Sequence, residues 1–377
     1  MILAINRGSS SIKFAVYPES LDRPAVSGKL ERIGLPDSVF RAWDGAHIAL
    51  VDQRAALVDH QAALKTLLDW LRGRNLDLRA VGHRVVHGGR RYDRPTLVTP
   101  EVVATLKSLI SLAPEHLPQE IAAIEAITRL HPDLPQVACF DTAFHRTMPR
   151  VAQLYGLPRE LADEGILRYG FHGLSYEYIA GEAPRGRVIA AHLGNGSSLA
   201  AIRDGVSVDT SMGFTPTGGI PMGTRSGDLD PAVVLYLIRE KKVPPARVGA
   251  LVNEHAGLLG LSGLGSDVRD LLAKENEFPA AAEAIAVFCY QARKYIGALA
   301  AALDGVDTLV FAGGIGENAS PIRERICAGL GYLGVRLDPA ANAGHAAVIS
   351  APDSKVSVRV IRTNEELVVA RHAKEQL

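Results

Sequence analysis

The chain has 377 residues, enough for two domains of ordinary size that each bury their own hydrophobic core. Lysine plus arginine and aspartate plus glutamate both number 41, so no basic excess indicates a nucleic-acid partner or an anionic membrane surface. The three cysteines, Cys139, Cys289 and Cys327, are too few and too scattered for a disulfide framework or a metal site, and we expect buried free thiols. The chain opens on a strand pattern rather than a signal peptide, which favours the cytoplasm.

Residues 2–17 predict a β-hairpin whose turn could hold phosphate. An apolar run gives way to NRGSSS at residues 6–11 and resumes as an alternating pattern over 12–16. The backbone N–H groups and hydroxyls of such a turn can face a bound anion, and Lys13 adds a positive charge at its foot. For this stretch alone, an ordinary Gly/Ser hairpin is the alternative.

The same pattern recurs in the second half of the chain. Residues 188–202 (VIAAHLGNGSSLAAI) again break an apolar run with a glycine–serine turn, and setting Gly8 against Gly196 aligns the Gly-Ser-Ser triplets and both flanking strands. Such a repeat predicts a duplicated domain with two phosphate-facing hairpins. Facing each other across a cleft, they could hold the two ends of a polyphosphate.

A buried arginine follows the first helix pattern. After a third strand candidate and a polar stretch to about residue 50, leucines and alanines at helical spacing predict a helix over residues 53–72. Residues 81–86 then predict a buried strand that contains Arg84. A buried guanidinium needs a counter-charge, so Arg84 makes either an internal salt bridge or a bidentate grip on a substrate carboxylate.

Two polar residues mark the end of the first half. Helices over 100–112 and 119–130 flank a stiff loop in which proline stands on both sides of His116. A strand over 136–140 ends at Asp141, where α/β folds place catalytic and metal-binding carboxylates, although a helix N-cap is the alternative. We expect the first domain to end near Pro149.

The second half contains several glycine-rich segments. His172 lies between glycines before a helix, and the loop over 209–228 contains Arg225. Residues 261–272 are expected to be a turn entering a helix. A long helix over 279–303 carries charged residues and is therefore a core helix rather than a membrane span.

A nucleotide-binding arrangement follows that helix. The strand over 308–311 opens into the turn AGGIGEN (312–318) and another helix, so that small residues can admit a nucleotide. Its spacing is not the dinucleotide fingerprint, which counts against a nicotinamide dehydrogenase. A strand over 356–361 and a capped helix complete the chain.

Eleven segments in chain order resemble the acetate kinases over the whole chain: INRGSSSIKF, HRVVHGG, LAPEHLP, FDTAFHRTMP, YGFHGLS, HLGNGSS, DTSMGFTP, GTRSGDLDP, SGLGSDVRD, FAGGIGEN and RTNEEL. This family belongs to the larger group of sugar kinases, actin and Hsp70 ATPases. The resemblance implies an α/β fold of two ribonuclease-H-like (actin-like ATPase) domains that arose by duplication, with the active-site cleft between them. The implied domains are 1–149, joined by the C-terminal helix 365–377, and 150–364.

The activity that the resemblance implies is a reversible phosphoryl transfer. The γ-phosphate of ATP passes directly and in line to the carboxylate of acetate, giving acetyl phosphate and ADP. The resemblance implies a homodimer that uses Mg²⁺, with Mn²⁺ as an alternative. From the balanced charge of the chain we expect no nucleic-acid or membrane partner.

The resemblance also assigns roles to individual residues. It implies the catalytic residues Asp141, Arg84, His172, Arg225 and His116. It implies the substrate-binding residues Arg84, Val86, Phe171 and Pro216. It implies the nucleotide-binding residues Lys13, His192, Leu193, Gly194, Asn195, Gly196, Asp267, Val268, Arg269, Gly314, Ile315, Gly316, Glu317 and Asn318. It implies the metal ligands Asn6 and Glu365, with Glu366 as the alternative to Glu365.

Elementary chemistry is compatible with these residue types. Acetate is already ionised at neutral pH, so its attack needs no general base but does need two anions to be held in line. Arginines and a divalent metal supply that. We therefore expect Asp141 to position the metal or a basic partner, and His172 to stabilise charge that spreads over the equatorial oxygens.

Four departures from the family pattern are visible: Arg7, Arg90, Thr217-Gly218 and the segment 115–117. Glu115 carries the most information, because the resemblance puts an apolar residue there, beside the acyl tail. Either Glu115 turns outward or pairs with an arginine such as Arg7 or Arg90, or it lines a pocket for a polar-tailed acid. The alternatives to an acetate kinase are accordingly a kinase of propionate, butyrate or a polar-tailed acid, or a non-catalytic ATP-binding module of the same superfamily.

Overall fold

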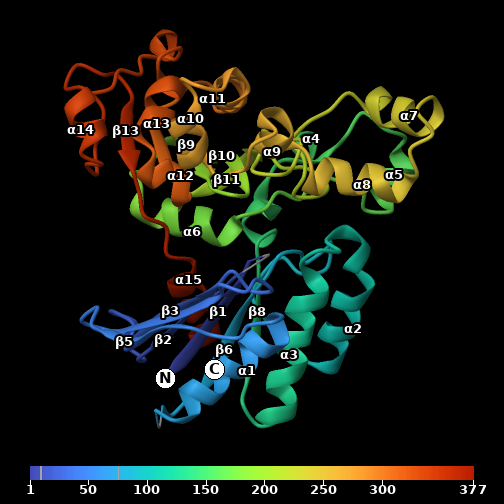
Figure 1. Ribbon diagram of the computed structural model, residues 1–377, viewed down its shortest axis with the longest axis vertical. Coiled ribbons are helices and arrows are strands. Elements are labelled where there is room, and N and C mark those ends of the chain that lie inside the picture. Colours follow the sequence, from blue (N-terminus) through green and yellow to red (C-terminus); the bar gives the residue numbers. More distant parts are fainter. Residues whose placement is uncertain (9–10, 75) are drawn as a thin grey trace. The chain divides into compact units, whose positions relative to one another are not determined.

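The computed structural model describes residues 1–8, 11–74 and 76–377. The chain divides into two compact units, one formed by Met1–Phe144 with Asn364–Leu377 and the other by His145–Thr363. These bounds differ slightly from the domain bounds expected from the sequence, 149/150 and 364/365. Each unit is built around one β-sheet with helices, so the expected α/β class is confirmed (Figure 1).

The sheet of the first unit contains eight strands in the order β5-β4-β3-β2-β1-β6-β8-β7. Strand β1 pairs antiparallel with β2 and parallel with β6, and β6 pairs parallel with β8. The carboxyl ends of β1, β6 and β8 therefore meet at one edge of the sheet. The strands are β1 Ile2–Arg7, β2 Ser11–Tyr17, β3 Val26–Glu31, β4 Val39–Asp44, β5 Ala49–Arg54, β6 Ala80–Val85, β7 Thr96–Leu97 and β8 Gln136–Phe140.

Helices cover both faces of this sheet. The helices of the first unit are α1 His60–Arg72, α2 Pro100–Ser108, α3 Leu117–Leu130 and α15 Glu365–Glu375, with a 3₁₀ turn at Ile110–Leu112. Side chains alternate along each strand, so Leu3, Ile5 and Val81 pack with α1 and α3 in one apolar core. On the opposite face Gly82 leaves room for α15, because a Cβ there would lie 2.5 Å from Val369 Cγ1. The last helix of the chain thus completes the first unit (Figure 1).

The sheet of the second unit repeats the central part of the first. Its order is β11-β10-β9-β12-β13, with β9 antiparallel to β10 and parallel to β12, and β12 parallel to β13. The order and strand directions match those of β3-β2-β1-β6-β8, as the sequence repeat predicts. The strands are β9 Arg187–Leu193, β10 Ser197–Arg203, β11 Val206–Thr210, β12 Thr308–Ala312 and β13 Ser357–Val360.

The two hairpin turns correspond in position but not in the expected register. Strand β1 ends at Arg7, before Gly8, whereas β9 ends at Leu193, before Gly194. Gly194 rather than Gly196 therefore stands where Gly8 does, so the alignment of the Gly-Ser-Ser triplets is wrong by two positions. The strand pairing, and not the serine pattern, decides which residues are equivalent. The predicted phosphate-facing role of Ser9 and Ser10 lies outside the described residues.

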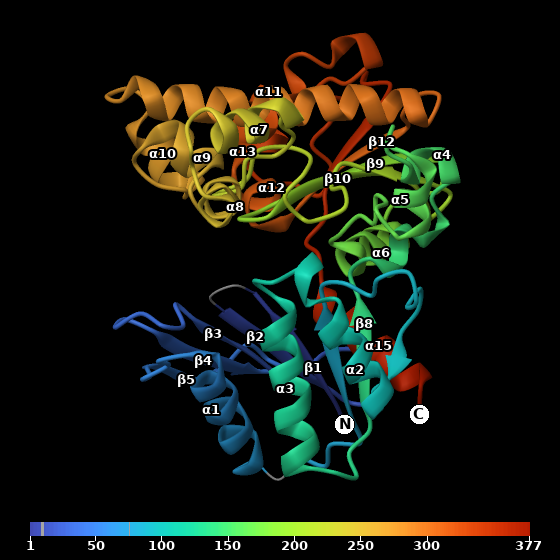
Figure 2. The ribbon, with the colours of Figure 1, turned by 90° about the vertical axis from the view of Figure 1, so that its right-hand side faces the viewer.

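One long helix forms the core of the second unit. Helix α11, Pro279–Ala302, buries Ile285, Phe288 and Ile296 against strand residues such as Ile189 and Phe311 (Figure 2). The other helices are α4 Arg150–Gln153, α5 Arg159–Asp163, α6 Gly173–Glu182, α7 Pro231–Arg239, α8 Pro245–Glu254, α9 Gly257–Ser262, α10 Val268–Lys274, α12 Gly313–Asn318, α13 Ser320–Cys327 and α14 Pro339–Ala343, with 3₁₀ turns at Ala143–Thr147 and Gly331–Leu333. None of the helices in the described part of the chain has the length and apolar surface needed to cross a bilayer.

Several expected elements differ from those found. The helix expected over 53–72 begins only at His60, where the Asp59 side chain accepts a hydrogen bond from the Ala62 N–H at 2.8 Å. The preceding residues belong to β5, and the stretch before residue 50 contains β3 and β4. The helix expected over 100–112 ends at Ser108, and the glycine-rich turn at 312–318 is mostly the short helix α12. All three cysteines are buried thiols, as predicted.

Candidate active site

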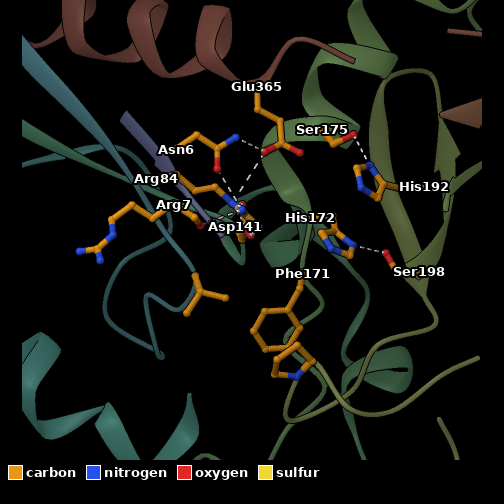
Figure 3. Close-up of polar contacts among 12 residues, drawn as sticks. Asn6, Arg7, Arg84, Asp141, Phe171, His172, Ser175, His192, Ser198 and Glu365 are labelled. Carbon is orange, nitrogen blue, oxygen red and sulfur yellow. Dashed lines mark hydrogen bonds and ion pairs between the residues drawn. The ribbon is translucent and has the colours of Figure 1, made fainter. Parts of the chain in front are cut away.

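Arg84 is the centre of a buried polar cluster at the carboxyl edge of the first unit's sheet (Figure 3). Its Nη2 lies 2.6 Å from Asp141 Oδ2, its Nε lies 3.8 Å from Glu365 Oε2, and its Nη1 donates to Asn6 Oδ1 at 3.0 Å. Burial lowers the pKa of this guanidinium, but Asp141 and Glu365 raise it by more, so Arg84 is firmly charged. Of the two alternatives for Arg84, the structure shows the internal salt bridge. A grip on a substrate carboxylate stays a prediction.

The parallel pairing of β6 with β8 explains why these residues meet. Arg84 lies opposite Cys139, and the Asp141 N–H donates to the Val85 carbonyl at 2.9 Å just beyond the end of the ladder. The Asp141 carboxylate is fully buried and pairs with Arg84. Residues far apart in sequence therefore converge because three parallel strands end at one edge.

The predicted metal residues also belong to this cluster. The Asn6 side-chain amide donates to Glu365 Oε2 at 2.8 Å and to Glu366 Oε1 at 2.9 Å. Both glutamates reach Asn6 because Asn364 caps α15 and directs its first turn to the end of β1. The choice between Glu365 and Glu366 stays open.

The chemistry of this donor set fits a hard divalent cation. It consists of oxygen atoms, which Mg²⁺ prefers. Asp141, Glu365 and Glu366 against Arg84 leave two negative charges, which one divalent ion would neutralise. Among the described residues no three His, Cys, Asp or Glu side chains form a preformed cage.

The other predicted residues of the first unit lie near this edge or on the surface. His116 is the N-cap residue of α3 and is half-buried, and Val86 is buried directly after β6. Lys13 is exposed on β2, opposite Asn6. Glu115 is exposed, so the outward alternative for this residue is the one found. Arg7 donates both to the main-chain carbonyl and to the side chain of Gln119.

Sequence reasoning missed the buried carboxylate of this region, Glu120. Only 4% of Glu120 is exposed, and its Oε2 accepts a hydrogen bond from the Val86 N–H at 3.0 Å. Burial raises its pKa to about 7, against the opposing effects of that hydrogen bond and of Arg84. One signal could have revealed it: Glu120 lies on the apolar stripe of α3, in helical spacing with Ile124 and Ile127.

In the second unit, two stacked histidines lie at the β9–β10 hairpin. His172 adopts a left-handed backbone conformation, with φ of 58°, and its Nδ1 lies 2.9 Å from Ser198 Oγ (Figure 3). Its ring stacks on that of His192 at 4.4 Å between centroids, and His192 Nδ1 lies 2.8 Å from Ser175 Oγ. Both histidines are therefore held in fixed orientations.

Gly196 brings His172 and Arg225 to one place. A Cβ at Gly196 would lie 3.3 Å from His172 Nε2 and 3.5 Å from Arg225 Nη1, so both side chains lie against this turn. Arg225 also donates to the Pro216 carbonyl at 3.2 Å. Phe171 is buried beside His172, and its carbonyl accepts from His145 Nε2 at 3.0 Å.

A pocket of about 430 Å³ adjoins the same turn. Three segments that the sequence proposed for nucleotide binding line it together, although more than 100 residues separate the first from the last. Asp267 caps α10 by accepting from the Arg269 N–H at 2.8 Å and pairs with the Arg269 side chain. The lining residues are Gly194, Asn195, Ser266, Asp267, Val268, Arg269, Gly314, Ile315, Asn318 and Ala319.

Some predicted nucleotide-binding residues lie next to this pocket without lining it. Leu193 and Gly316 are buried, and His192 is held in the histidine pair. The Glu317 carboxylate accepts from the Gly313 N–H at 3.1 Å and the Thr363 N–H at 3.3 Å, so it ties α12 to the segment that follows β13. Lys13, which was also predicted to bind the nucleotide, is a different case, because it belongs to the first unit.

Comparison with known proteins identifies the family of this chain. The model of the acetokinase family matches residues 1–371. The chain belongs to the acetokinase family. An acetate kinase of Rhodopseudomonas palustris is 47% identical over 99% of this chain and 97% of its own length, and one of Pseudothermotoga lettingae is 43% identical over 99% and 96%.

Two solved structures share the fold of this acetokinase over nearly its whole length. The crystal structure of Porphyromonas gingivalis acetate kinase covers 99% of the chain and 98% of its own length at 37% identity, with a TM-score of 0.87. That of a propionate kinase from Francisella tularensis covers 99% of each chain at 35% identity, with a TM-score of 0.92. This acetokinase is therefore an enzyme, a kinase with ATP as its co-substrate.

Proposed function

We propose that this acetokinase transfers the γ-phosphate of ATP to the carboxylate of acetate, giving acetyl phosphate and ADP, and that it also catalyses the reverse reaction. The observation that carries the proposal is the turn over residues 194–196. One end of it lines the 430 Å³ pocket, and the other end lies against His172 and Arg225. A nucleotide bound in that pocket would have its phosphates directed by the turn to a cation and an imidazole.

The chemistry of the proposed reaction requires charge compensation more than proton transfer. The acid reacts as a carboxylate, so no residue is assigned as a general base. We assign Arg225 and His172 to the charge that develops on the transferring phosphoryl group. We assign Arg84 and His116 to the acid end of the reaction, and Asp141 to holding Arg84 in place, because its carboxylate pairs with that guanidinium.

We assign the divalent cation, Mg²⁺ or Mn²⁺, to the oxygen atoms of Asn6 and Glu365, with Glu366 as the alternative to Glu365. When bound, the cation would neutralise phosphate charge. The surplus of two negative charges in the cluster supports this assignment. Acyl phosphate formation should therefore stop with excess chelator, and in Glu365→Ala the metal requirement should rise at least tenfold while the melting temperature changes little.

The two candidate acids, acetate and propionate, differ by one methylene. A methylene in an apolar pocket changes specificity by only about 1–3 kcal/mol. The exposed position of Glu115 favours an ordinary apolar acyl pocket, which we assign to Val86, Phe171 and Pro216. The similarity to a propionate kinase structure keeps propionate as the second candidate.

We further propose that the two compact units are the two domains of the duplicated fold, and that the enzyme acts as a cytoplasmic homodimer. Helix α7 supports the dimer, because it has a largely apolar sequence, PAVVLYLIR, and none of its residues is buried. Such a helix face is typical of a surface that pairs with another chain.

The experiment that tests the proposed function is a hydroxylamine trap for acyl phosphate. The native enzyme, ATP and Mg²⁺ are combined with acetate, propionate, butyrate and a hydroxy acid in turn. We expect product with acetate at the highest kcat/KM. Product with none of the acids would refute the proposal, and a higher kcat/KM for another acid would replace acetate by that acid.

A further inference from the structure

The buried carboxylate of Glu120 lies at the acid end of the proposed site. Glu120 belongs to the first turn of α3, directly after the His116 N-cap, and is 4% exposed. Glu115, five positions before it in the same loop, is exposed. The acidic side chain that faces the buried cluster is therefore Glu120.

The Glu120 carboxylate accepts a hydrogen bond from the first main-chain N–H beyond β6. The last paired residue of β6 is Val85, whose carbonyl accepts from the Asp141 N–H. The next N–H, that of Val86, has no strand to pair with and donates to Glu120 Oε2 at 3.0 Å. A buried N–H left without a partner is destabilising, so this contact fixes the main chain at Val86.

The charge of Glu120 is not needed for that contact. The amide oxygen of a glutamine would accept the same hydrogen bond without the cost of burying a carboxylate. The charged groups around Glu120 come from three strand ends: Arg84 of β6, Arg7 at the end of β1 and Asp141 after β8. Glu120 is thus a third carboxylate, after Asp141 and Glu365, that acts on Arg84.

Arg7 is a second cation that acts on Glu120. Arg7 is 6% exposed, its guanidinium turns away from Arg84 and Asp141 in Figure 3, and it donates to two neutral oxygen atoms of Gln119. Among the residues that the structure describes, none accepts a hydrogen bond from its Nε. Burial lowers the pKa of the Arg7 guanidinium to about 10. The negative charge of Glu120 opposes this effect and keeps the pKa from falling further. The negative charge of Glu120 therefore acts on two arginines, the buried Arg7 and the partly buried Arg84.

We propose that Glu120 is a positioning residue for the acid substrate, which holds the Val86 main chain at the acyl pocket and limits the positive field of Arg84. The inference rests on the proposed function, because it takes Arg84 and Val86 as the acid-binding residues. An ionised Glu120 weakens the attraction of Arg84 for an anionic acid, and a neutral Glu120 restores it. Since the pKa of Glu120 is raised to about 7, acid affinity should fall as the pH rises through neutrality.

Three variants separate the hydrogen bond from the charge. Glu120→Gln keeps an acceptor for the Val86 N–H and removes the charge, whereas Glu120→Leu removes both. Glu115→Gln is the matched control, because it makes the same change of charge at an exposed position of the same loop. The KM for acetate, the KM for ATP and kcat are measured for each between pH 5.5 and pH 8.5.

We expect Glu120→Gln to lower the acetate KM about three- to tenfold at pH 8 and to abolish its rise between pH 6 and pH 8. The ATP KM should stay within about twofold of native. Glu120→Leu should raise the acetate KM at least tenfold and change the propionate-to-acetate ratio, because the Val86 main chain is released. Glu115→Gln should match the native enzyme throughout.

The inference is overturned if Glu120→Gln leaves both the acetate KM and its pH dependence unchanged, or if it shifts the acetate and ATP KM values equally. If Glu120→Leu does not fold, Glu120→Gln alone decides. A native enzyme that forms no acyl phosphate refutes the proposed function. A native enzyme that turns over while its variants show no difference between the two KM values refutes the role of Glu120 alone.

Discussion

Arg84 and Asp141 form the most deeply buried ion pair among the described residues, and each depends on the other. The side chain of Asp141 is 1% exposed and that of Arg84 is 15% exposed. Removing one partner of such a pair leaves an uncompensated charge, which costs roughly 3–5 kcal/mol.

We therefore expect Arg84→Ala to lower the free energy of unfolding by roughly 3–5 kcal/mol and to raise the acetate KM. Adding Asp141→Asn should recover part of the lost stability but none of the acid affinity, because it removes the orphaned charge without restoring a cation. Urea unfolding of the two single variants and the double variant measures the coupling. If the effects of the single variants on stability are additive, the pair is not coupled as the structure indicates.

We propose that Arg225 acts on the phosphoryl group rather than on stability. It is half-buried and lies against Gly196 beside His172. We expect Arg225→Ala to reduce kcat by about 10²–10³ with a small change in either KM, because a transition-state contact is lost. Arg225→Lys should recover only part of the rate, since one ammonium group cannot form a bidentate contact.

The exposed Arg336→Ala is the control for Arg225, because its guanidinium pairs with Asp353 on the surface of the same unit. Its kcat should equal that of the native enzyme. A large rise in KM with unchanged kcat in Arg225→Ala would assign this arginine to substrate binding instead.

At the scale of the element, the short helix α12 depends on one glycine. Gly313 has a φ of +74°, and a Cβ there would lie 2.7 Å from the Leu193 carbonyl oxygen. This close approach lets α12 pack against the end of β9 and places Gly314, Ile315 and Asn318 in the pocket.

Gly313→Ala should therefore destabilise the second unit by about 1–3 kcal/mol and raise the ATP KM while the acetate KM is unchanged. Gly181→Ala in α6 is the matched control, since nothing lies within 4 Å of its added Cβ and alanine favours helices. Thermal melts and both KM values give the comparison. Equal melting temperatures for Gly313→Ala and the native enzyme would contradict the strain.

At the scale of the whole molecule, each unit contains a fully enclosed neutral histidine. In the first unit His83 Nε2 lies 2.8 Å from Gln136 Oε1, and in the second His145 Nδ1 lies 2.8 Å from Ser207 Oγ. Burial lowers the pKa of each imidazole to about 4, from 6.5 in an exposed side chain. The unfolded chain therefore binds protons between these values that the folded chain does not.

The free energy of unfolding should consequently fall as the pH is lowered from about 6.5 to about 4. Glu120 contributes with the opposite sign, because its raised pKa favours the folded state below about 7. Urea unfolding from pH 7.5 to pH 4.5 measures the slope, and His145→Gln should flatten it. The control variant His255→Gln, at an exposed position, should leave the slope unchanged. An unchanged slope in His145→Gln would exclude His145 as a cause of the pH dependence.

The proposed dimer makes a prediction at the same scale. Val233, Leu235 and Tyr236 of α7 are 43%, 46% and 51% exposed. Sedimentation of the native protein should give about twice the chain mass of 40.2 kDa. The Leu235→Glu variant should sediment with the mass of one chain, and its monomer should melt at the same temperature as a native monomer. A native monomer at micromolar concentration would refute the dimer.

The sequence by itself determined the α/β class, the duplication and most of the residues that converge. Apolar runs, helical spacing and glycine-rich turns are local signals, and they located β8, α11 and β12 to within a residue or two. The repeated hairpin was visible because both copies keep an apolar strand on each side of the turn. Cys139, Cys289 and Cys327 could be predicted as buried thiols from their apolar neighbours alone.

Only the tertiary structure showed which side chains contact one another. The ion pair of Arg84 joins residues 57 positions apart, and the contact of Asn6 with Glu365 joins residues 359 positions apart, so no local pattern could indicate either. The register of the second turn depended on strand pairing, which placed Gly194 where serine spacing had suggested Gly196. In the sequence, Glu120 looked like an ordinary helix residue. Its proposed role follows from the charged residues of three strand ends that surround it. Burial and neighbouring charges are properties of the fold and not of the sequence.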